Sequence, residues 1–222
     1  MLIVIGGAFY VLGPGKSEKS SGSGASGASG ADEKGWTSGD VRTVSHNAVC
    51  QPIAGIAAQL VPRPDPQGPP STRTDAATCH WRNLNDGRKH SRSISVTVVP
   101  HSPSLGPGRD QTAVEVASSA FQDSVRQYKA GPLGERVKGA RSVPALGDEA
   151  AIVYGVGTTD SGAAHLVIRR RNVAITITYQ GSDNSLRGNP TEGYYPVIRP
   201  LSQRAAEQGA LAIGRRLVAT FA

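Results

Sequence analysis

The sequence predicts an α+β fold: an antiparallel twisted sheet with about three helices packed on one face, and one disulfide. Its periodic segments follow the order helix, strand, strand, helix, strand, hairpin, helix. A doubly wound parallel sheet needs helices that alternate regularly with strands, and these helices are too few and too irregularly spaced. A single pair of cysteines is the second observation, because it allows only one internal bridge.

The first helix is expected between Pro52 and Pro62, and Cys50 lies just before it. Its apolar residues recur at helical spacing: Ile53, Ile56 and Leu60. A Pro-rich, irregular stretch over residues 62–75 follows, and a strand then opens at Cys79. A bridge between the two cysteines would therefore join the first helix to the first strand.

The middle of the chain carries a strand pattern and then a helix pattern. Apolar and polar residues alternate over residues 93–99, which is typical of a half-buried strand, and Pro100 ends it. A stripe of apolar residues predicts a helix over residues 111–129, with Gly131 and Pro132 as its stop signal. The members of that stripe are Val114, Ala117, Phe121, Val125 and Tyr128.

The last third of the chain is expected to contain a strand, a hairpin and a helix. The strand is predicted over residues 150–154. Residues 165–168 and 173–179 are expected to form the hairpin, with residues 170–172 at its tip. Ser202 is expected to cap the C-terminal helix, whose mostly small apolar residues allow close packing on a sheet.

The two cysteines, Cys50 and Cys79, indicate one disulfide and an oxidising compartment, because the N-terminus of the chain is apolar. In the chain-entropy account, closing a loop of this length stabilises the fold by ~3–4 kcal/mol. The alternative is a pair of buried free thiols in a cytosolic protein. Cys-x-x-Cys spacing, which thioredoxin-like and zinc-ribbon proteins use, does not occur in the sequence. We therefore expect a structural bridge, with Trp81 packed against it.

Three segments are expected along the chain. Residues 1–13 are apolar, but a helix of about 12 residues spans ~18 Å, short of the ~30 Å hydrocarbon core. They are expected to be a truncated membrane segment or signal anchor whose remainder precedes Met1. Residues 14–39, rich in Gly, Ser and Ala, are expected to be a disordered linker, and residues 40–222 an extracytoplasmic α+β domain. The expected location is the extracytoplasmic face of the cell membrane, held by a single N-terminal anchor.

The chain is basic, with a formal net charge of +7 and a sequence pI of about 9.7. Residues 1–39 sum to zero, so the excess belongs to residues 40–222. Basic residues are scattered there, and the only tight run consists of Arg169, Arg170 and Arg171. DNA-binding domains usually concentrate their charge on one helix or stripe. We therefore expect no nucleic-acid partner.

Several short motifs resemble those of a known family. They are the leading Cys50, the segment Cys79-His80-Trp81 with the alternating strand after it, and the Leu-Gly-Asp-Glu-Ala segment at residues 146–150. Together they make residues 45–221 resemble an actinobacterial family of unknown function, composed of cell-envelope lipoproteins and membrane-anchored extracytoplasmic domains. The layout is also similar to that of the extracellular sensor domain of a mycobacterial serine/threonine kinase.

The resemblance implies a fold and a cellular location but no catalytic residue, because none is established for the family. One departure concerns the anchor. Lipoproteins of the family carry a lipid-modified cysteine ahead of the domain, whereas this chain has an apolar segment and a Gly/Ser-rich stretch in that place.

No catalytic or metal-binding motif stands out. The five histidines have no His-x-His, His-x-x-x-His or His-Glu-x-x-His spacing, so we expect no metal site and no cofactor. Asp148 and Glu149 would point to opposite faces of an extended segment, which disfavours a paired acid and base. Instead, Gly147 is expected to allow a tight turn, with Asp148 bonded to nearby backbone amides.

Two groups of residues are candidates for ligand binding. The three arginines at the hairpin tip would suit an anionic polymer or headgroup, although such a run is more often a solvated tip. Residues 181–197 are expected to form a long polar loop, in which Arg187, Tyr194 and Tyr195 would line a binding site. The alternative is that this loop is simply mobile.

These observations predict a non-enzymatic binding or sensing module, monomeric and displayed at the cell envelope. Its partner would be an envelope protein, lipid or glycan, and its N-terminal segment would attach it to the membrane. The alternative is a hydrolase whose site is assembled from distant loops.

Overall fold

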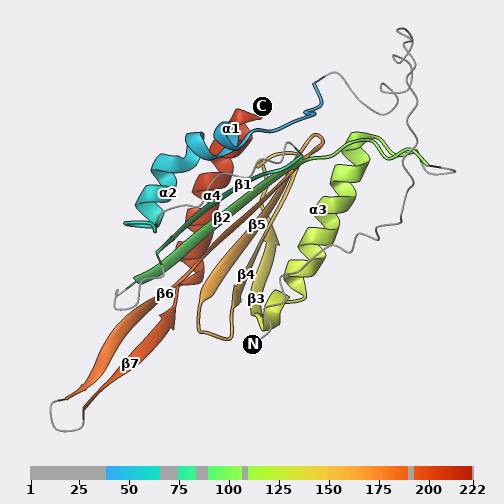
Figure 1. The fold of residues 1–222 in the computed structure, drawn as a ribbon. Coiled ribbons are helices and arrows are strands. Elements are labelled where there is room, and N and C mark those ends of the chain that lie inside the picture. Colours follow the sequence, from blue (N-terminus) through green and yellow to red (C-terminus); the bar gives the residue numbers. More distant parts are fainter. Residues whose placement is uncertain (1–38, 66–74, 84–89, 107–109, 190–192, 222) are drawn as a thin grey trace, which may run out of the picture. The chain divides into compact units, whose positions relative to one another are not determined.

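The computed structural model describes residues 39–65, 75–83, 90–106, 110–189 and 193–221 (Figure 1). The predicted membrane segment at residues 1–13, and the predicted linker except for its last residue, lie outside the described residues. Among the described helices, none is both long enough and apolar enough to cross a membrane.

The described strands form a single seven-stranded sheet in the order β1-β2-β6-β5-β4-β3, with β7 paired to β6. All paired strands are antiparallel, so the predicted α+β class with an antiparallel sheet is confirmed. The strands are β1 (Ala77–Asn83), β2 (His90–Pro100), β3 (Arg136–Ser142), β4 (Glu149–Val156), β5 (Gly162–Arg170), β6 (Val173–Asn189) and β7 (Gly193–Pro200).

The helices cover both faces of the sheet instead of the single face expected. Helix α4 lies on one face together with α1 and α2, and α3 lies on the other (Figure 1). The helical elements are α1 (His46–Cys50), α2 (Ala54–Leu60), α3 (Ala113–Lys129) and α4 (Gln203–Thr220), with the short 3-10 turns η1 (Gln51–Ile53) and η2 (Pro132–Gly134).

Side chains of strand β5 are buried on both faces of the sheet. Leu166 and Ile168 are fully buried in the main core beneath α4, whereas Val167 packs in a second cluster with Phe121 and Val125 of α3. Seven consecutive residues of β5 are therefore buried. A strand covered on both faces carries a continuous apolar run instead of an alternating one.

Several predicted elements are confirmed. Ile94, Val96 and Val98 of β2 share the buried face of the sheet, as predicted from their alternation. Ser202 caps α4 by accepting a hydrogen bond from the amide of Ala205 at 3.3 Å. The first helix begins earlier than expected, at His46, and runs in three pieces as α1, η1 and α2.

Two strands were not predicted. β3 is rich in arginine, lysine and glycine and is mostly exposed at the edge of the sheet, so it has no apolar alternation. The prediction of a loop at residues 181–197 is wrong, because β6 continues to Asn189 and pairs with β7. Residues 182–189 of β6 are mostly polar, and β7 carries apolar residues on both faces, so neither shows the period-two alternation of a half-buried strand.

The predicted disulfide is confirmed. Cys50 at the end of α1 is bonded to Cys79 of β1, with their Cα atoms 5.7 Å apart. Trp81, two residues further along β1, is 7 % exposed and belongs to the same core as both cysteines. The bridge therefore ties the first helical segment to the strand at one edge of the sheet.

Gly209→Ala is expected to destabilise the protein, because the added carbon would collide with the ring of Tyr179, against which α4 packs. In an open helical position the same change stabilises by up to ~1 kcal/mol, but this collision should turn the gain into a loss of about 1–3 kcal/mol. Gly55→Ala in α2 is the matched control, since nothing lies within 4 Å of its added carbon. Urea unfolding of both variants measures the difference, and equal free energies of unfolding would contradict this packing.

Candidate functional site

The main candidate site is a two-stranded extension of the sheet, formed by residues 182–189 of β6 and by β7, which we call the ribbon. Strand β5 accompanies β6 only as far as Gly181, and β2 only as far as Asp183. β6 pairs with β7 from Ser182 opposite Pro200 to Asn189 opposite Gly193, and beyond Asp183 β7 is its only partner among the described strands. Figure 1 shows the ribbon projecting past the end of the main sheet.

Hydrogen bonds and ion pairs hold the base of the ribbon to β2. The Asp183 carboxylate accepts from Arg92 at 2.5 Å and from the His90 ring at 2.8 Å. Arg92 also donates to the carbonyl of Ser182 at 2.7 Å. Burial alone would raise the pKa of Asp183, but these hydrogen bonds and the positive charge of Arg92 hold it below its ordinary value. The ribbon therefore leaves the sheet in a defined direction.

The structure brings together the three ribbon residues that the sequence singles out. Arg187 is exposed on β6 and lies opposite Tyr195 of β7, and Tyr194 lies opposite the next residue, Gly188. Ile198, further along β7, is 46 % exposed and is one of two large apolar residues with that degree of exposure in the described part of the chain. Arginine and tyrosine on a projecting element are typical of protein-binding surfaces.

The second predicted group, the three arginines at the hairpin tip, is engaged inside the protein. Arg169 donates to Glu149 at 2.5 Å, and Arg170 donates to Asp148 at 2.8 Å. Arg171 donates its backbone amide to Asp148 at 2.5 Å. The tight turn expected at residue 147 is present, with a φ of 74°. The expected role of Asp148 as an acceptor for a nearby backbone amide is also confirmed.

Asp148 therefore links the turn before β4 to the tip of the β5–β6 hairpin. Burial by itself would raise the pKa of the Asp148 carboxyl. The Arg171 amide, the Arg170 hydrogen bond and the two positive charges outweigh it and keep the pKa low. Arg169 and Arg170 already pair with internal carboxylates, and the Arg171 guanidinium donates to the carbonyl of Gly39 at 2.9 Å. The group is therefore poorly placed to hold a separate anion.

A polar cluster that the sequence did not reveal lies between α3 and the sheet. The His165 ring on β5 contacts a Glu135 carboxylate oxygen at 2.8 Å through Nε2 and the Thr178 hydroxyl at 3.0 Å through Nδ1. The ring of Tyr128 from α3 stacks on it, with centroids 4.2 Å apart. His165 is 4 % exposed. The signals in the sequence are weak, because Glu135 is 30 positions from His165 and sits outside any periodic segment.

The chemistry of this cluster follows from burial. Burial lowers the pKa of His165, and the charge and hydrogen bond of Glu135 oppose that shift without cancelling it. A neutral imidazole that faces a carboxylate must carry its proton on Nε2, so Nδ1 accepts from the hydroxyl of Thr178. Burial also raises the pKa of Tyr128, and the nearby Glu135 charge adds to that rise.

Carboxylate, imidazole and hydroxyl in a row also occur in the triads of acyl-transfer enzymes. Thr178, however, lies in the middle of the sheet, opposite Ser95 of β2 on one side and His165 of β5 on the other. The backbone amides around Thr178 are already bonded in the β-ladders with β2 and β5. A catalytic triad also requires amides directed at the substrate oxygen that gains negative charge. A groove of about 510 Å³ lies between α3 and the β3–β4 turn, lined by residues that include Phe121 and Lys129 but not Thr178.

No protein-family model matches the chain, and no curated protein is similar enough to it to count as a relative. The resemblance to actinobacterial envelope proteins therefore remains a prediction.

His165→Asn is expected to weaken the dependence of stability on pH. Because the pKa of His165 is lowered in the folded state, the unfolded chain binds the proton first, and stability falls as the pH drops through about 6.5. His80 and His101 also have lowered pKa values, so the variant should retain part of the slope. Glu135→Gln removes the opposing charge and should increase the loss. Urea unfolding between pH 7.5 and 5 tests both, and identical profiles would contradict the assignment.

Asp148→Ala is expected to cost about 1–3 kcal/mol in the free energy of unfolding, because two arginines and one backbone amide lose their acceptor. Asp123→Ala is the control. Its ion pair with Arg126 is highly exposed on α3, and such pairs contribute about 0–1 kcal/mol. Thermal and urea unfolding give the comparison, and an equal loss of unfolding free energy in the two variants would contradict this role of Asp148.

Proposed function

We propose that the domain is a non-enzymatic binding or sensing module, displayed outside the cytoplasm, that docks a protein partner through the ribbon. The observation that carries the proposal is the extension of β6 and β7 beyond the sheet, where no third strand pairs with them past Asp183 among the described residues. The disulfide supports an oxidising location, because such bridges persist there and are rare in the cytosol.

The ribbon lacks the support that usually stabilises a pair of strands. A two-stranded hairpin is marginally stable in water unless a third strand or a packed layer supports it. The main part of the sheet has α3 and α4 against its two faces, but neither helix makes extended contacts with β7 in the described part of the chain. A partner that packs on the ribbon would supply the missing layer and bury Ile198.

The ribbon is large enough for a specific contact. Its eight residue pairs extend over about 25 Å, at ~3.3 Å per residue. Prolines at positions 196 and 200 of β7 lack amide donors, which weakens the addition of another strand along that edge. In this register Arg187 and Ile198 lie on opposite faces of the ribbon, so we propose that the partner wraps around the ribbon and contacts both faces.

A hydrolase is the second candidate, favoured by the row formed by Glu135, His165 and Thr178. In that mechanism Thr178 would be the nucleophile and His165 its base. The test is hydrolysis of envelope esters and glycans by the purified domain. Activity that Thr178→Val abolishes and Ser95→Ala leaves intact would establish the enzyme and overturn the binding proposal.

Site-specific photo-crosslinking tests the ribbon directly. A photoreactive amino acid replaces Arg187 or Ile198 in cells that display the protein, and Arg215 on the exposed surface of α4 is the control position. We expect one discrete protein adduct at the two ribbon positions and none at the control. Equal labelling at all three, or adducts that are only lipid or glycan, would contradict a protein partner at the ribbon.

A variant then tests specificity. Ile198→Ser in a chain with the photoreactive group at position 187 should reduce the adduct at least tenfold, because the exposed apolar contact is lost. The melting temperature should stay within a few degrees of the parent value, since Ile198 is already half exposed. Undiminished crosslinking in this variant would show that the ribbon contact is not specific.

A further inference from the structure

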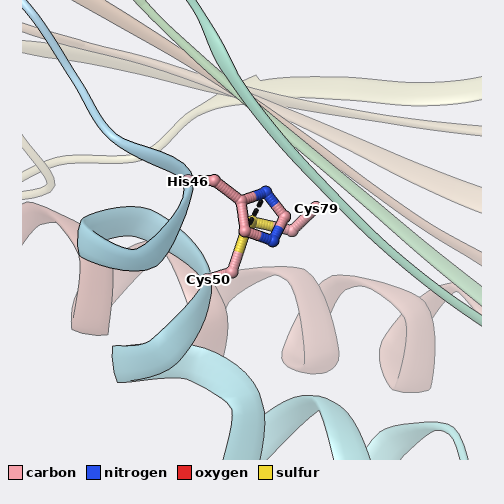
Figure 2. A group of neighbouring side chains, drawn as sticks. All are labelled: His46, Cys50 and Cys79. Carbon is pink, nitrogen blue, oxygen red and sulfur yellow. Dashed lines mark hydrogen bonds between the residues drawn. A yellow bond between two sulfur atoms is a disulfide. The ribbon is translucent and has the colours of Figure 1, made fainter. Parts of the chain in front are cut away.

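The disulfide has a histidine beside it. His46 precedes Cys50 by four residues, so the two side chains lie on the same side of α1, next to Cys79 of β1 (Figure 2). Nδ1 of His46 is 3.3 Å from the sulfur of Cys50. The donor atoms of the three residues all lie within 4.8 Å of one another. Two sulfurs and an imidazole nitrogen therefore converge on one point of the fold.

This corner is reachable from solvent on one side. A groove of about 460 Å³ lies over it, and His46, Cys50 and Trp81 are among the residues that line it. Cys50 is 7 % exposed, whereas Cys79 is fully buried. A small ion or reductant would therefore meet His46 and Cys50 first.

We propose that the reduced form of this corner binds a zinc ion, with His46, Cys50 and Cys79 as its ligands. Zinc favours thiolate and imidazole donors at about 2.3 Å and 2.0–2.1 Å, which places sulfur and nitrogen atoms about 3.5–3.8 Å apart in a tetrahedron. The distance of 3.3 Å between Nδ1 of His46 and the sulfur of Cys50 is already close to that value. Once the bridge is cleaved, the two sulfurs must open to about 3.8 Å.

The overall step balances with a dithiol as the reductant. The dithiol gives two electrons to the Cys50–Cys79 bridge and becomes a disulfide itself. The two thiols so formed lose their protons when Zn²⁺ binds, so two protons are released for each ion bound. Two thiolates then neutralise the charge of the metal, and a water molecule completes the tetrahedron.

The histidine must also change its partner. In the oxidised form the bridged sulfurs carry no proton, so Nδ1–H of His46 donates to the Thr78 carbonyl at 3.1 Å, with the Cys50 sulfur beside it. In the zinc form one ring nitrogen gives its lone pair to the metal. His80 is the natural control, because neighbouring residues of a strand point to opposite faces and His80 is exposed while Cys79 is buried.

The test is metal titration of the whole chain after reduction with a phosphine and removal of the reductant without air. Co²⁺ reports thiolate ligands through its charge-transfer and tetrahedral d–d bands, and competition with a chelator gives the Zn²⁺ affinity. We expect one ion per reduced chain and none in the oxidised chain. His46→Ala should weaken binding at least tenfold, His46→Cys should restore it, and His80→Ala should leave it unchanged.

Circular dichroism separates binding from loss of fold. If reduction loosens the domain, Zn²⁺ should restore the folded spectrum and raise the melting temperature of the reduced wild type, but not of Cys50→Ser/Cys79→Ser. The proposal is overturned if the reduced wild type binds no more tightly than that double variant. It is also overturned if His46→Ala binds as tightly as the wild type, or if a reduced, unfolded chain gains no structure with zinc.

Discussion

The structure depends on the pairing of β6 with two neighbours at once. Through residues 173–181 it bonds to β2 on one edge and β5 on the other, and Ile175 and Ile177 are fully buried in the core beneath α4. A slip of one residue would move both isoleucines to the opposite face. Because the ribbon is the same strand continued, the register set in the core also fixes which residues the ribbon presents.

The same register organises the buried polar groups. It places Thr178 of β6 opposite His165 of β5, so the hydroxyl and the imidazole meet. At the hairpin turn, fully buried Asn172 donates to the carbonyls of Val41 and His101 and accepts from the amide of Val41. A buried polar group is costly unless it is bonded, and these groups bond within the fold. The hydrogen-bonding capacity of these core groups is therefore used within the fold, whereas the ribbon is exposed.

The sequence predicted what periodicity and local chemistry determine. The alternation of β2 and β6, the cap at Ser202 and the Cys50–Cys79 bridge are all present. It missed the position of α3, because β5 is buried on both faces and carries no alternating pattern. It also missed the His165 cluster, whose members come from α3, β5, β6 and the residue between η2 and β3. That proximity follows from strand register and helix docking, which a single sequence does not contain.

The charges support the proposed choice of the ribbon, and not of the basic run, as the surface for a partner. The chain has 24 basic and 17 acidic residues, yet two arginines of its densest basic segment, Arg169 and Arg170, pair with Asp148 and Glu149 inside the fold. Each arginine of that segment already has an internal acceptor, so an incoming anion would have to displace a carboxylate or carbonyl that is held in place. On the ribbon, the exposed apolar side chain of Ile198 is carried by the same two strands as Arg187, and burying it requires no such exchange. In the proposed mode of binding, association through the ribbon would therefore break no contact within the core.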